Sequence, residues 1–427
     1  MVNLGRASRR EARAAAPAVE ARATSPEDAG MLHSLQAFRP FRLLFMGTLA
    51  TNSAFWMYQI AVGWLALQKT DSPLFVGLTG FAGGIPLLFL ALPAGVVIDR
   101  FDRRKVLMTA QVGVMSVAAM FALLVGTDLI QRWSILLLAF LYGIVMSFVF
   151  PTRNAIVPDL VDREHLANAV ALNAAGQNAT RVVGPSLAGL LIALIGISGT
   201  FAVAASMQIL ALYWTSQLPS SASAKSARGG TLWTSLTVGL RIVAKDSFLV
   251  GLILLATATT VLIMPYINLM PVFARDELGL GSSGLGVLMA ASGLGSVGGA
   301  LSVARYRKLA TWPGIQITTA GGFAILVLIF AITPSVILAT ALLFVAGLMS
   351  AAYMAINQTV LQLKVEDEVR GRVLSIYLLT WGMLPLGQLP LGALADRIGA
   401  PAATTIACAI ALGCVGLIAI RYPSLRK

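Results

Sequence analysis

The sequence has few charged side chains and almost no histidine or cysteine. Only 11% of its 427 residues are charged, whereas 57% are hydrophobic, and the mean hydropathy is +0.83. Such a chain has too little polar surface to coat a soluble globule of its size, which excludes an ordinary soluble enzyme or binding domain. The two cysteines, Cys408 and Cys414, fall in one apolar segment, so we expect neither a disulfide framework nor a thiolate metal site.

Acidic residues are scarce as well, with 18 Asp and Glu against 31 Lys and Arg. None lies within the long apolar runs, so a buried proton-carrying carboxylate is not visible. The G-x-G-x-x-G pattern at 293–298 lies inside an apolar run with no acid after it, and we therefore expect no nucleotide cofactor. The basic residues fall between apolar runs rather than in one domain, which argues against binding to nucleic acid.

Twelve apolar runs dominate the chain, and each is long enough to cross about 30 Å of hydrocarbon. Lipid offers no partner to unpaired backbone groups, so these runs must be helices. We therefore predict an all-α integral membrane protein with twelve transmembrane helices. The predicted spans are Leu43–Leu67, Leu74–Ile98, Val106–Val125, Trp133–Phe150, Asn168–Ile195, Ser198–Leu218, Ser247–Phe273, Gly284–Val303, Gly314–Ile332, Ser335–Ile356, Val373–Ala395 and Pro401–Ile420.

The chain divides into two halves at a Ser-, Ala- and Gly-rich stretch, Pro219–Gly230. A constant shift along the sequence superposes Gly83 on Gly286 and Asn154 on Asn357, which indicates two pseudo-symmetric six-helix bundles. The predicted organisation is a disordered tail (1–41), an N-terminal bundle (42–218), a linker with an amphipathic segment (219–246), a C-terminal bundle (247–421) and a short tail (422–427).

The basic residues predict the orientation of the chain, because short loops rich in Lys and Arg stay in the cytoplasm. With both termini cytoplasmic, all but five of the basic residues lie on the inner side. Lys69, Arg132, Arg275 and Arg397 lie outside, and Arg181 lies inside the fifth span. We expect a multi-pass protein of a bacterial inner (plasma) membrane.

The loop between the second and third spans carries a motif. Gly95, Asp99, Arg100, Arg103 and Arg104 form a G-x-x-x-D-R-x-x-R-R pattern that resembles the loop motif of the major facilitator superfamily. One position departs from it, since Asp102 stands where the family usually has glycine. A simple topology anchor would explain the cations but not the glycine and the acid at that spacing.

The fifth span carries a second resemblance. Leu172-Asn173, Asn178 and the run Arg181–Gly189 resemble the corresponding helix of the enterobactin exporter branch of this superfamily. Gly184-Pro185 is also similar to a motif common in exporters. Together the similarities cover nearly the whole chain apart from the tail.

The resemblance implies a secondary active transporter rather than an enzyme. It implies export of a small amphipathic molecule, such as a siderophore or drug, by alternating access of a monomer in the lipid bilayer, coupled to proton entry. Two alternatives stay open, namely a lipid flippase of the same fold and a non-transporting membrane sensor or scaffold.

The resemblance also implies a gate at the inner side. Asp99 is expected to lie against Arg153 and against the start of the eleventh helix, where a carboxylate meets unpaired N–H groups. The residues expected to take part in gating are Gly95, Asp99, Arg100, Arg103, Arg104, Arg153, Gly184 and Pro185.

Polar and aromatic stripes at helical spacing predict the wall of a central cavity. The candidate substrate-binding residues are Asn52, Trp56, Gln59, Asn173, Gln177, Arg181, Tyr266, Asn268, Tyr377, Trp381 and Gln388. Ordinary packing between membrane helices is an alternative for each of them.

Arg181 is the most informative of these candidates, because a charge near mid-membrane is costly. In one interpretation its guanidinium faces the cavity and receives an anionic or phenolic oxygen of the substrate. In the other it bonds to helix carbonyls and to the amides of Asn173 or Gln177 and locks the N-terminal bundle.

Overall fold

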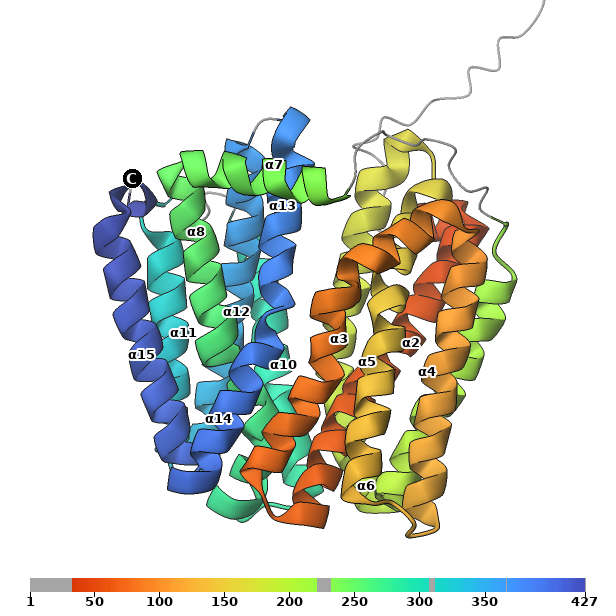
Figure 1. Ribbon diagram of the computed structural model, residues 1–427, viewed down its shortest axis with the longest axis vertical. Helices are drawn as coiled ribbons and strands as arrows, with labels where there is room; N and C mark the ends of the chain where they lie inside the picture. Colours follow the sequence, from red (N-terminus) through yellow and green to blue (C-terminus); the bar gives the residue numbers. More distant parts are fainter. Residues whose placement is uncertain (1–32, 221–231, 307–311, 366, 427) are drawn as a thin grey trace, which may run out of the picture.

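The computed structural model describes residues 33–220, 232–306, 312–365 and 367–426, and these residues contain helices and turns but no strand (Figure 1). The first half comprises α1 (His33–Ala37), α2 (Arg39–Thr70), α3 (Pro73–Arg100), α4 (Arg103–Gly126), α5 (Arg132–Ile156), short 3-10 turns at Val157–Asp159 and Arg163–His165, and α6 (Leu166–Ser216). The second half comprises α7 (Leu232–Lys245), α8 (Ser247–Ala258), α9 (Met270–Val272), α10 (Ser282–Arg305), α11 (Ile315–Ala331), α12 (Val336–Lys364), α13 (Asp367–Trp381), α14 (Leu384–Ile398), α15 (Ala400–Arg421) and a 3-10 turn at Pro423–Arg426.

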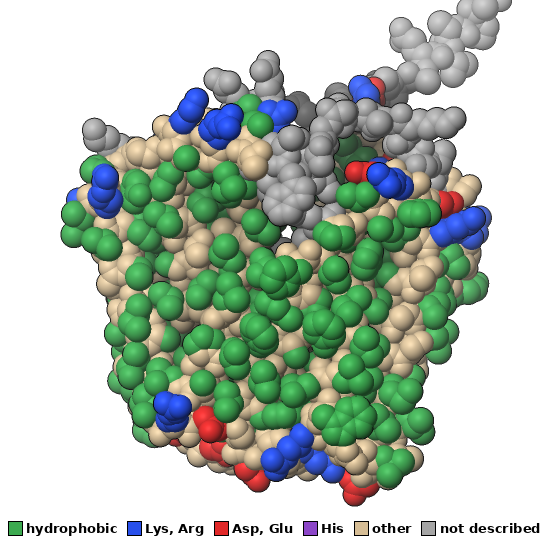
Figure 2. Space-filling model, in the orientation of Figure 1, with side chains coloured by type: hydrophobic (Ala, Val, Ile, Leu, Met, Phe, Trp, Pro, Cys, Tyr) green, Lys and Arg blue, Asp and Glu red, His purple; other side chains and the backbone are tan. Residues whose placement is uncertain are grey.

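The surface fits a membrane protein. Hydrophobic side chains cover the middle of the face in Figure 2, and the charged side chains lie at its two ends. Within the described residues, nine helical segments are long and apolar enough to cross a membrane. The helix α2, the shorter helix α11 and a reversal inside α6 account for the difference from twelve crossings, so the predicted fold class is confirmed.

The reversal inside α6 occurs at Gly196, between the predicted fifth and sixth spans. Its φ of 75° and ψ of 177° lie in a region of backbone space that is essentially open only to glycine. Asn168, near the start of α6, accepts a hydrogen bond from the Ser34 N–H, and the carbonyl of Ser216, at its end, accepts one from Arg104. The two halves of α6 therefore run antiparallel.

Two predicted spans are each found as one candidate crossing but are not regular α-helices along their whole length. The seventh span passes from α8 through a π-helical turn (Thr259–Ile263), a 3-10 segment (Met264–Leu269), α9 and a second π-helical turn (Phe273–Glu277). Pro265 and Pro271 are each the second residue of one of these short segments, where a proline interrupts the preceding helical turn because it has no N–H to donate.

The eleventh span is divided into α13 and α14 at Gly382 and Met383. These two residues donate 3-10-type hydrogen bonds to Leu379 and Thr380. Pro385 follows directly in the first turn of α14 and cannot donate to the preceding helix. The break places Trp381 and Gln388 on separate short helices.

The chain becomes helical earlier than predicted, since α1 and the start of α2 fall in residues assigned to the disordered tail (1–41). Pro40 occupies the first turn of α2, where a missing N–H costs nothing, and Phe41 is fully buried. The rest of that tail and residues 221–231 of the linker lie outside the described residues.

The helices form two bundles, one on each side of Figure 1. We call the end that carries α7 and the C-terminus the linker end, and the end that carries the α2–α3 turn the turn end. The ribbons of the two bundles diverge toward the linker end in Figure 1 and converge toward the turn end. There the backbones touch: a Cβ on Gly77 of α3 would lie 2.9 Å from the Cα of Gly392 in α14, and one on Gly286 of α10 would lie 3.2 Å from the Cα of Gly189 in α6.

Candidate functional site

Two adjoining cavities lie between the bundles, and both are lined by Gln59 of α2 and by Gly80 and Gly83 of α3. One has a volume of about 130 Å³ and is also lined by Phe55, Phe150, Trp381, Pro385 and Gln388. The other has a volume of about 50 Å³ and is also lined by Trp56, Asn268, Pro271 and Met289. Because both bundles contribute to each cavity, any relative motion of the bundles reshapes it.

Five of the eleven predicted substrate-binding residues line these cavities: Trp56, Gln59, Asn268, Trp381 and Gln388. Asn268 and Gln388 come from the C-terminal bundle and reach α3 at Gly80. A Cβ on Gly80 would lie 1.9 Å from Asn268 Nδ2 and 2.9 Å from Gln388 Oε1. The absence of a side chain at this position is what allows the two amides to approach α3.

The other predicted residues lie farther back. Asn173 is buried and donates to Asn154 Oδ1 at 3.4 Å. Tyr266 is buried and packs edge-on against Phe323 and Phe330. Tyr377 is buried in the hydrophobic core of the C-terminal bundle, so the structure gives it a packing role there. Asn52 is buried with an unpaired Oδ1, and Gln177 is half-buried one turn before Arg181.

Arg181 lies on the face of Trp56, with its guanidinium carbon 5.6 Å from the ring centroid. This distance is within the range of a cation–π contact. Among the residues that the structure describes, Arg181 has no hydrogen-bond acceptor, and Tyr266 of the C-terminal bundle is close enough to interact with it electrostatically. The alternative in which the amides of Asn173 or Gln177 hold the guanidinium is therefore not what the structure shows.

The contact between α6 and α2 that places Arg181 depends on Gly184, one turn farther along α6. A Cβ at Gly184 would lie 2.6 Å from Trp56 Cβ and 3.2 Å from the Ser53 carbonyl oxygen. Only glycine lets the two helices approach this closely. The Gly184-Pro185 pair, predicted to act in gating, thus also sets the distance between Arg181 and Trp56.

Sequence reasoning missed two tyrosines. Tyr58 and Tyr142 stack face to face with their centroids 3.5 Å apart, and each lines one of the two cavities. Both are almost fully buried, and within the described residues neither hydroxyl has a partner. Their positions in the middle of predicted spans, away from the interfacial belts where tyrosine is usual, were the available signal.

Side chains of the predicted gating loop make hydrogen bonds that hold the loop in place. The Asp102 carboxylate accepts hydrogen bonds from the N–H groups of Arg104 and Lys105 at 2.9 and 3.4 Å, so the residue that departs from the family motif caps α4. Arg103 donates to the Ala155 carbonyl and to Asp159 at 2.9 and 2.8 Å. This loop is therefore fastened to the end of α5.

The predicted contact between Asp99 and Arg153, expected when the inner gate is closed, is not made in this structure. Arg153 is 2% exposed and donates to the Gly47 carbonyl and to Thr51 Oγ1 of α2 at 2.7 and 2.8 Å. The guanidinium faces the interior of the N-terminal bundle, where one backbone carbonyl and one hydroxyl of α2 are its acceptors. Asp99 and Arg100 are exposed at the end of α3, one turn after Gly95, and the docking of Asp99 on α13 stays a prediction.

Comparisons with known proteins agree with this architecture. A family model described as transmembrane secretion effector matches residues 34–427. The staphyloferrin A transporter of Staphylococcus aureus is 26% identical over 363 residues, which cover 84% of this chain and 88% of that protein. The multidrug efflux pump Tap of Mycobacterium tuberculosis is 28% identical over 412 residues, which cover 91% of this chain and 94% of that protein.

Solved structures show the same fold. A bacterial homologue of the human lysosomal transporter Spinster, in an inward-facing and unoccupied conformation, superposes with a TM-score of 0.71 at 15% identity, covering 91% of this chain and 99% of that one. The resemblance to the major facilitator superfamily carried by the loop and by the fifth span is thereby confirmed. The chain belongs to the transmembrane secretion effector family of that superfamily, whose members in these comparisons are membrane transporters.

Proposed function

We propose that this protein is a secondary active exporter of a small amphipathic molecule and works by alternating access. The names of the relatives, a siderophore transporter and a multidrug efflux pump, support export of this class of compound. The cavities between the bundles support a shared substrate site, and the convergence of the bundles at one end supports a cycle in which the two ends open in turn.

The proposed orientation puts the linker end in the cytoplasm of a bacterium and the turn end outside. The linker end carries cations from both bundles, among them Arg103, Arg104, Arg241 and Lys245, and such residues resist translocation. In this orientation the two bundles converge toward the outer end. The protein would act as a monomer in the inner membrane.

The observation that carries the proposal is Arg181 lying on Trp56 with no acceptor among the described side chains. A guanidinium in this position binds a carboxylate with two parallel hydrogen bonds, which lysine cannot do, and it can also donate to the single oxygen of a phenolate. The rings of Trp56 and Trp381 supply flat apolar walls, and the amides of Gln59 and Gln388 supply both donors and acceptors. The preferred substrate would be an aromatic or amphipathic compound with an anionic oxygen.

Coupling to proton entry is part of the proposal. In the described helices the carboxylates lie near the ends, as Asp99, Asp276 and Asp396 do, rather than at mid-membrane. Proton binding would therefore act on the ends of the bundles rather than at a carboxylate beside the substrate.

The function is tested by uptake into inverted membrane vesicles under an imposed proton gradient, screened over siderophores, anionic and cationic drugs, and lysolipids. Gradient-dependent uptake of an anionic amphiphile is expected. Uptake of lysolipids alone would identify a flippase, and uptake of none of these compounds would contradict a transport function. The Arg132→Lys variant, which changes an exposed cation at the turn end, provides a matched control for substitutions at Arg181.

A further inference from the structure

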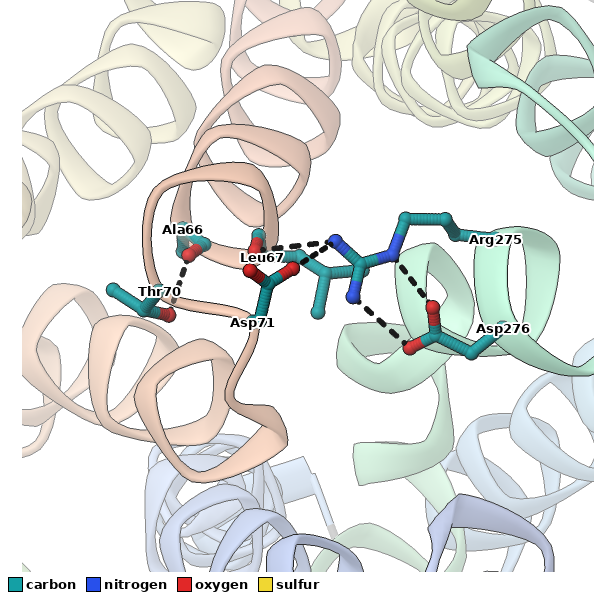
Figure 3. Close-up of polar contacts among 6 residues, drawn as sticks. All are labelled: Ala66, Leu67, Thr70, Asp71, Arg275 and Asp276. Atoms are coloured by element: carbon teal, nitrogen blue, oxygen red, sulfur yellow. Dashed lines mark hydrogen bonds and ion pairs between the residues drawn. The ribbon is translucent and has the colours of Figure 1, made fainter.

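The α2–α3 turn is the place where the C-terminal bundle holds the turn end of the N-terminal bundle. The last turn of α2 ends at Asp71, whose φ of 50° places it in the left-handed region. The Ala66 carbonyl accepts a hydrogen bond from Thr70 Oγ1, and the Leu67 carbonyl accepts one from the Asp71 N–H (Figure 3). The turn therefore presents the negative end of α2 next to the positive end of α3.

Arg275 of the C-terminal bundle reaches the α2 side of this turn. Figure 3 shows its guanidinium between the two bundles, donating to Asp71 Oδ1 at 2.7 Å and, at a longer 3.4 Å, to the Leu67 carbonyl. A cation is favourable at this position, because the last carbonyls of a helix carry partial negative charge.

Asp396 of α14 reaches the α3 side of the same turn. Its Oδ1 accepts hydrogen bonds from Ser72 Oγ at 2.6 Å and from the Leu74 N–H at 3.3 Å. An anion is favourable here, because the first N–H groups of a helix carry partial positive charge. The C-terminal bundle thus offers a cation to the end of one helix and an anion to the start of the next.

Arg275 is shared between the bundles. Besides Asp71 it contacts Asp276 of its own bundle, with Nε 2.6 Å from Oδ1 and Nη2 3.2 Å from Oδ2. When the bundles separate, the guanidinium of Arg275 retains its ion pair with Asp276. Asp276 therefore stabilises the parted state, whereas Asp71 stabilises the joined one.

We infer that the contacts of Arg275 and Asp396 with the α2–α3 turn, here called the clasp, form and break reversibly and hold the turn end closed. Asp276, which competes with Asp71 for Arg275, sets how easily the clasp opens. The inference rests on the proposed alternating-access function. The neighbouring ion pair of Lys69 and Asp128 belongs entirely to the N-terminal bundle, at 2.8 Å, and does not join the bundles. The hydrogen bond from Lys69 lowers the pKa of the Asp128 carboxyl.

The test measures the distance across the turn end in the full-length protein in nanodiscs. Spin labels at cysteines replacing Thr127 and Ile332, one exposed residue from each bundle, report this distance on a background in which Cys408 and Cys414 are alanine. Pulsed electron paramagnetic resonance then gives the joined and parted populations.

Asp71→Asn should raise the parted population by roughly two- to fivefold, the size expected for an exposed ion pair. Asp276→Asn should lower the parted population, because Asp71 is then the only carboxylate that pairs with Arg275. Asp128→Asn, which breaks the pair within one bundle, should leave the distances unchanged. All differences should shrink in 1 M salt.

Equal shifts in Asp71→Asn and Asp276→Asn, or no shift in either, would overturn the clasp. Each variant is first checked for a single monodisperse peak in size-exclusion chromatography. Should Asp71→Asn fail this check, Arg275→Gln replaces it and must also raise the parted population. The distance measurement requires no substrate, so it is independent of the transport assay. The clasp can be refuted while vesicle transport is observed, and transport can be absent while the distances change as predicted.

Discussion

Replacing Gly184 by alanine tests whether the close approach of α6 and α2 sets the position of Arg181. The new Cβ would lie 2.6 Å from Trp56 Cβ, whereas ordinary contact begins near 3.5 Å. The helices must therefore separate locally by about 1 Å. Arg181 lies one turn away on the same helix, and its present 5.6 Å from the Trp56 ring is close to the limit of about 6 Å for a cation–π contact.

The energies favour a net loss of stability in Gly184→Ala. Alanine in place of glycine gains about 1 kcal/mol of helix propensity, whereas overpacking costs about 1–3 kcal/mol. Pro185 follows Gly184, and its ring crowds any Cβ on the preceding residue, which adds to the cost. Loss of the cation–π contact removes about 0.5–2 kcal/mol of the energy that positions Arg181. The KM for an anionic substrate should therefore rise, by at most roughly thirtyfold if all of that energy is taken from binding.

The assay compares vesicle transport and thermal stability of Gly184→Ala with those of Gly321→Ala. A Cβ on Gly321, inside α11, meets nothing within 4 Å, so this control gains helix propensity without overlap. We expect Gly321→Ala to be as stable as the wild type or more so, with an unchanged KM. If Gly184→Ala matched this control in both measurements, the packing argument would be refuted.

Three further substitutions test other parts of the account. Gly80→Ala should displace Asn268 and Gln388 from α3 and raise KM without loss of expression, and an unchanged KM would contradict the cavity assignment. Asp102→Ala should remove the cap of α4 and destabilise the protein by about 1 kcal/mol, measured as a lower Tm. Asp102→Asn should keep most of the stability, because asparagine is also a good N-cap residue. Asp99→Asn should slow turnover while membrane insertion stays normal, and wild-type turnover would count against a gating role.

Much of the fold could be predicted from the sequence because membrane helices are fixed by long apolar runs and by charge. The break at Gly196 fell between two predicted spans. The loop matched the family motif at every position except Asp102. The interruptions within the seventh and eleventh spans could not be predicted, because Pro265 and Pro385 can also be accommodated as kinks within a helix.

The candidate site was harder to predict, because its geometry depends on contacts between helices distant in the sequence. Polar spacing identified Gln59 and Gln388 as cavity residues but gave no sign that Tyr58 stacks on Tyr142. The partners of Arg153 were missed because one of them is a backbone carbonyl, which any residue carries.

The most direct test of the central claim compares an anionic transported compound with its neutral methyl ester in the wild type and in Arg181→Lys. The wild type should prefer the acid, because the guanidinium offers it two charge-assisted hydrogen bonds. Arg181→Lys should lose roughly ten- to a hundredfold of affinity for the acid, the equivalent of about 1.5–3 kcal/mol, and little for the ester, with normal expression and with Arg132→Lys unchanged. Equal preference for the acid in the wild type and in Arg181→Lys would contradict the account.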